Sequence, residues 1–281
     1  MPDPLSPIRP RRIIVQVTDR CNARCRHCGY HGGERSTGRI DLKSVDAFVE
    51  AFTHRWGAPE KSGLTGGEPM LYPGLTRDLI RRIARQGSVV RLLTNASWAT
   101  SAQEALQGVE KLMKAGLSGF WISAGVFHNE HVPEEFTQHL VFASERLGVP
   151  YYLNFTYLHP LEKAVRSRGL PRIDGQIADD VQTLKLHKQF ADSHPAGTHG
   201  WARVWDIGRA SGLIDTLGKA KARRIRKDLA RAVEKGEGGL LDLVGLGLGN
   251  TVFFRETTLG RSPSGRFTRL LARIHPVTAP S

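Results

Sequence analysis

The three cysteines of the chain, Cys21, Cys25 and Cys28, all lie within one eight-residue segment. Thiolates gathered on a short loop are typical metal ligands, because soft sulfur binds zinc and iron–sulfur clusters well. A structural zinc site needs four ligands, and His27 or His31 could supply the fourth. A [4Fe–4S] cluster normally takes four thiolates, so three would leave one iron open for a substrate or cofactor. The spacing therefore predicts a metal site of one of these two kinds.

A second short motif consists of Gly66, Gly67, Glu68 and Pro69, about 40 residues after the cysteines. Two glycines let the backbone approach a ligand closely, and the proline ends a strand. Alone, such a segment is an ordinary turn at the end of a strand. Together with the CxxxCxxC spacing, however, it resembles the radical S-adenosylmethionine (SAM) superfamily, in which this segment receives the amino group of SAM.

The resemblance implies a function for the cysteine motif. Cys21, Cys25 and Cys28 would hold three irons of one [4Fe–4S] cluster, and the fourth iron would chelate the amino and carboxylate groups of SAM. A flavodoxin or ferredoxin would reduce the cluster, which cleaves SAM to methionine and a 5′-deoxyadenosyl radical. That radical abstracts hydrogen from an unactivated C–H bond, so we expect an enzyme. The family usually has an aromatic residue before the last cysteine, where this chain has His27.

The elements that must position these motifs alternate between strand and helix. The helical pattern is clearest where Val45, Val49, Phe52 and Trp56 recur on one face. We predict strands at residues 12–18, 61–65, 89–94, 120–123, 151–156 and 202–205. We predict the main helices at residues 41–56, 75–86, 101–115, 133–147 and 177–193. Alternation of this kind predicts parallel βαβ units.

Six such units fit the partial (β/α)6 TIM-like barrel that the resemblance implies, followed by a basic, mainly helical C-terminal extension. Sites in such barrels lie at the carboxyl ends of the strands, where both motifs are placed. We expect an N-terminal tail at residues 1–11, the barrel at residues 12–210, and at residues 211–281 the extension, which could serve as a substrate lid. No cysteine follows Cys28, so protein thiolates cannot hold a second cluster of the kind found in SPASM or twitch extensions.

Polar residues near other strand ends are further candidates. In the family such positions often contact the ribose or carboxylate of SAM, and the resemblance extends this role to Asn95, Ser123 and Asn154. The alternative for each is a local turn hydrogen bond. No acid–base pair can be assigned.

The candidate catalytic residues are His128, Tyr157 and Arg203. Residues that could also line the barrel or follow its strands are Phe127, His131, Tyr152, His159 and Trp205. Because alternate residues of a strand point in opposite directions, about half of such a set should face away from the site.

Charge bears on the partner. The chain has 281 residues and a formal net charge of +13, which favours an anionic partner. No aromatic residue accompanies the basic stretch between residues 210 and 248, so nucleic acid is not expected. Three cysteines exclude a disulfide-stapled secreted domain. No run of about 20 apolar residues and no signal peptide is present, so we expect a cytoplasmic protein that does not cross a membrane.

The sequence therefore favours a radical SAM enzyme acting on a polar, anionic small molecule of sugar or nucleoside type, in specialised-metabolite biosynthesis. One alternative is the epimerisation or crosslinking of a ribosomal peptide. Another, from a different class, is a basic binding module without catalysis that zinc or a cluster stabilises. The fate of the substrate radical is open, because the chain has no cysteine beyond the motif to donate hydrogen.

Overall fold

A computed structural model describes residues 11–29, 32–158, 178–194, 197–203, 209–234 and 251–254. Its strands form one sheet in the order β6-β5-β4-β3-β2-β1-β7, and every neighbouring pair is parallel. The strands are β1 Arg12–Thr18, β2 Lys61–Gly66, β3 Val89–Thr94, β4 Leu117–Ala124, β5 Tyr151–Tyr157, β6 Thr198–Arg203 and β7 Thr251–Phe254. Strands β1 to β6 therefore follow one another in chain order, as in a partial TIM barrel.

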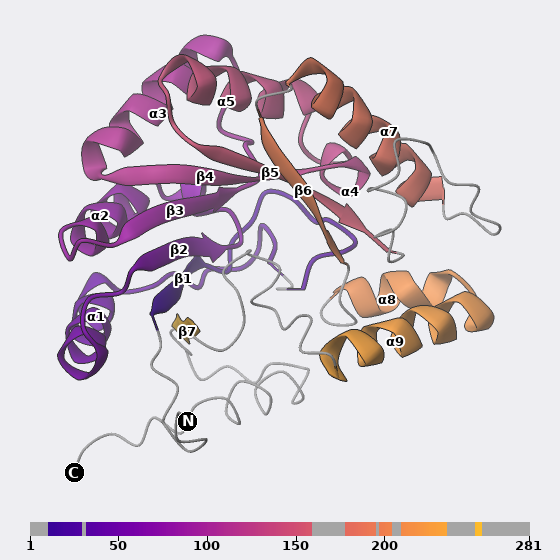
Figure 1. Ribbon diagram of the computed structural model, residues 1–281, viewed down its shortest axis with the longest axis horizontal. Coiled ribbons are helices and arrows are strands. Elements are labelled where there is room, and N and C mark those ends of the chain that lie inside the picture. Colours follow the sequence, from indigo (N-terminus) through magenta and orange to yellow (C-terminus); the bar gives the residue numbers. More distant parts are fainter. Residues whose placement is uncertain are drawn as a thin grey trace, which may run out of the picture.

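Helices connect these strands and cover one side of the sheet (Figure 1). The covering helices are α1 Leu42–Trp56, α2 Pro73–Ala84, α3 Ala102–Ala115, α5 Glu134–Arg146 and α7 Ala178–Ser193. Short helices follow two strands, namely η1 Pro69–Leu71 after β2 and α4 Val126–Asn129 after β4. A further pair, α8 Arg209–Thr216 and α9 Lys219–Glu234, follows β6. The predicted parallel α/β class is thus confirmed.

The main core lies between the sheet and its covering helices. Alternate residues of β1, Ile13 and Val15 among them, are fully buried there against Val45 and Phe52 of α1. The other residues of β1, Ile14 and Gln16 among them, belong to the opposite face, because successive side chains of a strand point to opposite sides. This assignment of faces decides which strand residues can reach a site inside the barrel.

Local sequence signals account for several helix ends. The Asp41 side chain accepts a hydrogen bond from the Ser44 backbone N–H at the start of α1. Ser101 caps α3 in the same way by accepting the Glu104 N–H. Gly116 ends α3 in the left-handed conformation, with φ of 105°. None of the helices in the described ranges is both long and apolar enough to span a membrane.

Two strands differ from the prediction. The sixth was predicted at residues 202–205 but runs from Thr198 to Arg203, because Gly200 pairs with Asn154 inside the sheet although glycine favours loops. The fourth begins at Leu117, three residues before its predicted start.

The C-terminal extension also contributes a strand, β7, which pairs with β1. Helix α8 spans the predicted boundary at residue 210.

Candidate active site

The cysteine loop follows β1 at the carboxyl end of the sheet. The Cys28 N–H donates to the Cys25 carbonyl at 3.2 Å, and the Cys21 N–H donates to the carbonyl of Gly33 at 3.2 Å. The Ala23 N–H donates to the Cys21 Sγ at 3.4 Å. None of the three cysteines forms a disulfide with another, and Cys25 is buried while the other two are half-buried. The loop is therefore shaped by its own backbone, with the sulfurs left unbonded to one another.

Cys21 and Cys25 are held in their protonated form. Burial raises the pKa of Cys21 to about 11. Burial, followed by the nearby Cys28 and Cys21, raises the pKa of Cys25 to about 12. A metal that binds here must displace these protons, since the ligand is the thiolate. Three thiols on one loop fit the donor set of an iron–sulfur cluster with an open iron.

The three cysteines pack in one small group with Ala23 and Val132. Within the described part of the chain, no three His, Cys, Asp or Glu side chains form a preformed metal site. The donor chemistry of the loop, three thiols on one short segment, fits a cluster.

The glycine motif lies against the beginning of the cysteine loop. The Gly67 N–H donates to the Thr18 carbonyl at 2.7 Å, and the Glu68 N–H donates to the Arg20 carbonyl at 2.8 Å. A Cβ atom on Gly67 would lie 1.9 Å from the Arg20 oxygen. Gly66 has φ of 134°, and a Cβ there would lie 2.3 Å from the Thr18 oxygen. Only glycine permits this approach, so the motif is required for packing two backbone segments together.

The carboxylate of Glu68 joins the ends of β2 and β3. Its Oε1 accepts from the Met70 N–H at 3.0 Å and the Thr94 hydroxyl at 2.9 Å, and its Oε2 accepts from the Asn95 N–H at 2.8 Å. The residue is 1% exposed, and burial raises the pKa of its carboxyl to about 7 against the lowering effect of these hydrogen bonds. Pro69, also buried, opens η1 directly after it. The described contacts of Glu68 are thus with the protein, although the motif suggested a ligand.

Asn95 connects the end of β3 to the cysteine loop. Its Nδ2 donates to Asn22 Oδ1 at 3.1 Å and lies 3.9 Å from the Cys21 Sγ, while its Oδ1 accepts from the Ser97 N–H. The next residue, Ala96, has φ of 63°, which costs about 1 to 2 kcal/mol for a residue with a Cβ. The loop after β3 is therefore held in a strained form beside Cys21, as is common at functional sites.

Ser123 and Asn154 lie opposite each other on β4 and β5. Both alternate with residues of the helix-covered core, Ile122 and Leu153, so they belong to the barrel-facing side. Asn154 is 7% exposed, and its Oδ1 has no hydrogen-bond partner in the described structure. A buried amide oxygen without a partner is costly unless a ligand supplies a donor. Ser123 and Asn154 therefore lie on the barrel-facing side, and Asn154 has hydrogen-bonding capacity left for a ligand.

His128 lies on α4 beside the cysteine motif. Its ring is 4.8 Å from that of His27, which in turn is 5.1 Å from Phe127. Burial lowers the pKa of His128 to about 4 and that of His27 well below its usual value. Both rings are therefore neutral near pH 7, and His27 packs as an aromatic residue would at this position.

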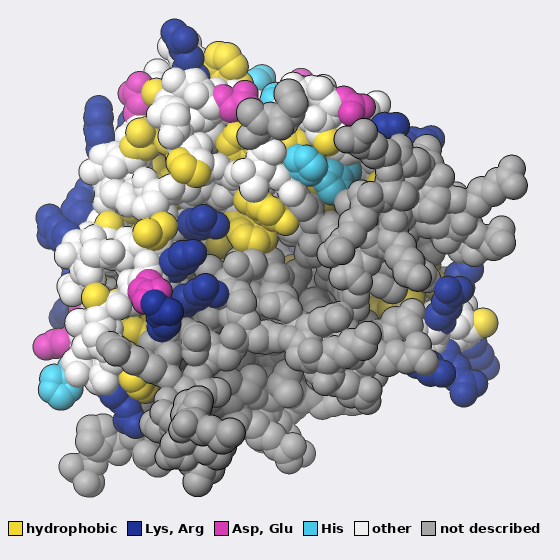
Figure 2. Space-filling model, viewed as in Figure 1, with side chains coloured by type: hydrophobic (Ala, Val, Ile, Leu, Met, Phe, Trp, Pro, Cys, Tyr) yellow, Lys and Arg dark blue, Asp and Glu magenta, His cyan; other side chains and the backbone are white. Residues whose placement is uncertain are grey.

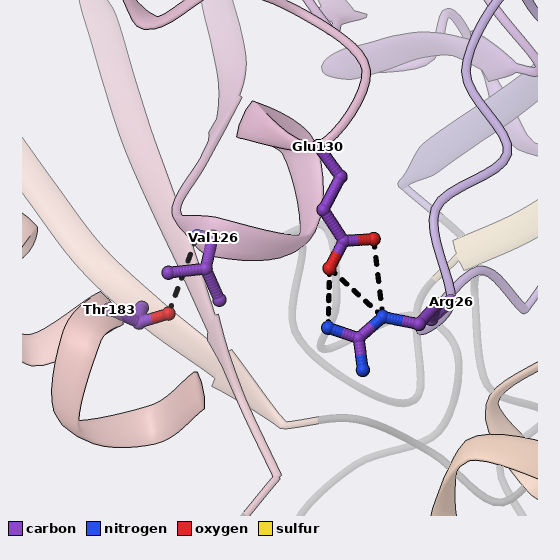
Figure 3. Close-up of polar contacts among 4 residues, drawn as sticks. All are labelled: Arg26, Val126, Glu130 and Thr183. Atoms are coloured by element: carbon purple, nitrogen blue, oxygen red, sulfur yellow. Dashed lines mark hydrogen bonds and ion pairs between the residues drawn. The ribbon is translucent and has the colours of Figure 1, made fainter. Parts of the chain in front are cut away.

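An ion pair fixes α4 to the same motif. Figure 3 shows the Arg26 guanidinium facing the Glu130 carboxylate, with Nε to Oε1 and Oε2 distances of 2.9 and 3.2 Å. On the other side of α4, the Val126 N–H reaches the hydroxyl of Thr183 on α7 at 3.5 Å. Helix α4 is thus held between the cysteine loop and α7.

Tyr157 is a correction to the candidate catalytic residues. It is fully buried on the helix-covered side of β5, where its hydroxyl lies 2.9 Å from His187 Nδ1 of α7. The Nε2 of His187 lies 2.8 Å from His199 Nδ1 on β6. Tyr157 shares the helix-covered face of β5 with Leu153 and Phe155. Because the opposite face of the strand is the one that faces the barrel, Tyr157 cannot line the barrel. Arg203 ends β6 in register with Tyr157, and its side chain lies outside the described residues.

Three other predicted positions, His31, His159 and Trp205, also lie outside the described residues. Trp121 and Tyr152, by contrast, pack against each other on the barrel-facing side of β4 and β5, with ring centroids 4.3 Å apart and a tilt of 42° between the rings. Trp121 was not among the predicted residues, although its place two residues before Ser123 on the same strand would have indicated the shared face.

The sequence analysis also missed Arg209, the first residue of α8. Its Nε donates to the Cys25 carbonyl at 3.1 Å and its Nη1 to the Gly32 carbonyl at 2.7 Å. Its backbone N–H donates to the Cys28 carbonyl at 3.0 Å. An arginine at a helix start carries no signal in a single sequence that would connect it with a loop 180 residues earlier.

Comparison with known proteins gives matches of two kinds. Residues 15–131 match the family model described as the radical SAM superfamily. A GTP 3′,8-cyclase of Pelotomaculum thermopropionicum is 29% identical over 216 residues, covering 73% of this chain and 62% of that protein. A Bacillus subtilis protein named for peptide biosynthesis, YydG, is 22% identical over 118 residues, covering 42% of this chain and 37% of that protein. The chain thus spans less than two thirds of each curated relative.

Among solved structures, the [FeFe]-hydrogenase maturase HydG aligns with a TM-score of 0.47 and 14% identity. The alignment covers 88% of this chain and 57% of HydG.

Proposed function

Because the chain belongs to the radical SAM superfamily, whose enzymes use a [4Fe–4S] cluster and SAM, we propose that Cys21, Cys25 and Cys28 hold one such cluster. SAM binds beside it, at the carboxyl ends of the strands. The observation that carries this proposal is the close packing of the two motifs, in which Gly67 leaves no room for a Cβ against the Arg20 carbonyl next to Cys21.

The residues of the chain position the reactants and exclude water from them. When bound, the cluster and SAM together supply a 5′-deoxyadenosyl radical that takes hydrogen from an unactivated C–H bond. Gly66 and Gly67 let the backbone at the end of β2 approach the ligand closely, and Glu68 keeps the ends of β2 and β3 together. Asn154 offers a carbonyl oxygen to a donor on SAM or substrate. A flavodoxin or ferredoxin delivers the electron.

The substrate we propose is an anionic small molecule of nucleoside or sugar type. Support comes from the net charge of +13 and from a relative that is named for a reaction of GTP. On the barrel-facing side, Arg91 of β3 offers a cation, and the packed rings of Trp121 and Tyr152 offer an aromatic surface. Such groups suit a phosphate and a base.

A second concentration of charge lies outside the barrel. The pair α8–α9 exposes Lys and Arg side chains at one edge of the molecule, visible in Figure 2 at the place that α8 and α9 occupy in Figure 1. Among the side chains of α9 that the structure describes, the exposed cations are Lys219, Lys221, Arg223, Arg224 and Lys227. With no aromatic residue among them, this surface suits general attraction of anions better than recognition of bases.

The test is the stimulation of SAM cleavage by candidate substrates. Reconstituted protein receives dithionite and SAM with either nucleoside phosphates, GTP among them, or peptides. The proposal expects a nucleotide or sugar phosphate to increase 5′-deoxyadenosine release, and a deuterated substrate to transfer deuterium into it. Stimulation by peptides alone would favour the second candidate function, the modification of a ribosomal peptide. The similarity to YydG over 118 residues supports this second candidate.

A further inference from the structure

The helical pair α8–α9 forms a small core of its own that includes residues next to the cysteine motif. Its buried members are Ala210, Leu213 and Ile214 of α8, Ala222 and Ile225 of α9, Phe127 of α4, and Leu158 after β5. The pair therefore packs on the barrel through Phe127 and Leu158 and does not stand apart from it. Figure 1 shows α8 and α9 side by side near the end of β6.

Phe127 continues this packing into the cysteine loop. Its ring lies 5.1 Å from the ring of His27, which stands between Cys25 and Cys28. The Arg26 guanidinium lies over the same ring, 5.3 Å from its centroid. Phe127, a buried member of the core formed by α8 and α9, thus also contacts His27 and Arg26 of the cysteine motif.

Arg209 adds direct hydrogen bonds between α8 and the loop. Its guanidinium donates to the carbonyls of Cys25 and Gly32, on either side of Cys28, and its backbone N–H donates to the carbonyl of Cys28 itself. The planar guanidinium holds two acceptors in a fixed relative position, which a lysine ammonium does not do. One residue of α8 therefore ties together three points of the segment 25–32.

We propose that Arg209 is a positioning residue for the cluster-binding loop, and that α8 and α9 are a structural part of the cluster site. This inference rests on the proposed function. By fixing the backbone at Cys25, Cys28 and Gly32, Arg209 limits the arrangements that the thiols of this loop can take. The guanidinium also places a positive charge beside the cluster, which stabilises the reduced, more negative state and raises the midpoint potential.

The test compares Arg209→Gln and Arg209→Lys with the control Arg224→Ala, which removes an exposed cation of α9 away from the loop. After anaerobic reconstitution, iron release to a chelator is followed by absorbance and the midpoint potential is measured by electron paramagnetic resonance titration. We expect R209Q to lose iron about 10- to 100-fold faster, as when a supporting contact of a metal site is removed. Its potential should also become more negative.

The lysine variant and the control separate positioning from general stability. R209K keeps the positive charge but loses the planar guanidinium that binds two carbonyls. It should therefore keep the midpoint potential near the wild-type value and still release iron faster. R224A should match the wild type in both the iron release rate and the midpoint potential. If R209Q does not fold, R209K carries the test through iron release alone. Wild-type iron release and potential in R209Q, or wild-type iron release in R209K, would overturn the inference. Failure of the wild-type protein to load iron would instead overturn the proposed function.

Discussion

The carboxylate of Glu68 accepts the backbone N–H of Asn95 at 2.8 Å, and so fastens the end of β2 to the end of β3. Through the amide of Asn95, which donates to Asn22, the same joint extends to the cysteine loop. The acidic residue of the glycine motif thus organises the site from within the protein. Three donors converge on this one buried side chain, which makes it a sensitive point for substitution.

Glu68→Gln should destabilise the fold. Glutamine has one acceptor oxygen, and placing it towards Met70 and Thr94 turns its NH2 group towards the Asn95 N–H, so two donors face each other. We expect the free energy of unfolding to fall by about 1 to 3 kcal/mol, the cost of a buried group without its partner. Urea unfolding of the apo protein at about pH 5 measures it.

The cost of this substitution should depend on pH with a defined sign. The folded pKa of Glu68, about 7, lies above the ordinary value of 4.5, so the stability it contributes is present below pH 4.5 and is lost as the pH rises through 7. The glutamine variant lacks this dependence. Its deficit relative to the wild type should therefore be larger near pH 5 than near pH 8. An equal or larger deficit at the higher pH would contradict the burial argument.

Gly67→Ala should disrupt the contact between the two motifs, because its Cβ would fall 1.9 Å from the backbone oxygen of Arg20. Backbone cannot move aside as a flexible side chain does, so we expect a loss of several kcal/mol or failure to fold. Gly74→Ala is the matched control, since nothing lies within 4 Å of a Cβ there and alanine favours α2. Thermal unfolding of both variants is the measurement. Equal melting temperatures would contradict the packing described here.

Asn154→Leu separates a ligand contact from a structural one. The Asn154 Oδ1 is buried without a partner in the described structure, so an apolar side chain of similar size should leave stability unchanged or slightly higher. If SAM or substrate uses this oxygen, KM should rise about fivefold, which corresponds to one neutral hydrogen bond of about 1 kcal/mol. A marked loss of stability with an unchanged KM would assign Asn154 a purely structural role.

His187→Gln should weaken the acid sensitivity of the protein. Burial, followed by the nearby His199, lowers the folded pKa of His187 to about 4, below its ordinary value of 6.5. Its contribution to stability is therefore present above pH 6.5 and is lost as the pH falls through 4. Glutamine can bond to both Tyr157 and His199 but does not titrate. Urea unfolding from pH 7 to 5 should show a smaller loss in the variant, and parallel losses would contradict this assignment.

Much of the fold could be predicted because alternation of strands and helices leaves a strong pattern. Residues of the two motifs were found because their types and spacing are unusual. The face of Tyr157 could also have been predicted, since it shares its parity with Leu153 and Phe155, two core residues of the same strand. Tyr157 was predicted as a catalytic candidate because it lies near the end of a strand. The alternation of side chains along β5 would have placed it on the opposite face, away from the barrel.

The remaining features depend on contacts that a single sequence does not display. Pairing of β7 with β1 joins residues about 240 positions apart, through a strand of four residues. Arg209 reaches the cysteine loop only because the fold returns α8 to the end of β1. Glu68 follows the two glycines of the second motif, and only the geometry reveals that its carboxylate turns towards β3.

Replacing Cys21, Cys25 and Cys28 together by alanine should abolish the cluster and SAM cleavage while leaving the sheet intact. The three residues pack in a small group with Ala23 and Val132, apart from the main core, so the far-ultraviolet circular dichroism should stay close to that of the apo wild type. Iron analysis and chromatography of 5′-deoxyadenosine are the measurements. Retained SAM cleavage would refute the assignment of the ligands.

The most direct measurement is anaerobic reconstitution of the chain, followed by metal analysis and addition of dithionite and SAM. The account predicts about four irons and four sulfides per chain, absorbance near 400 nm, and release of 5′-deoxyadenosine. Stoichiometric zinc with no cleavage of SAM would contradict it.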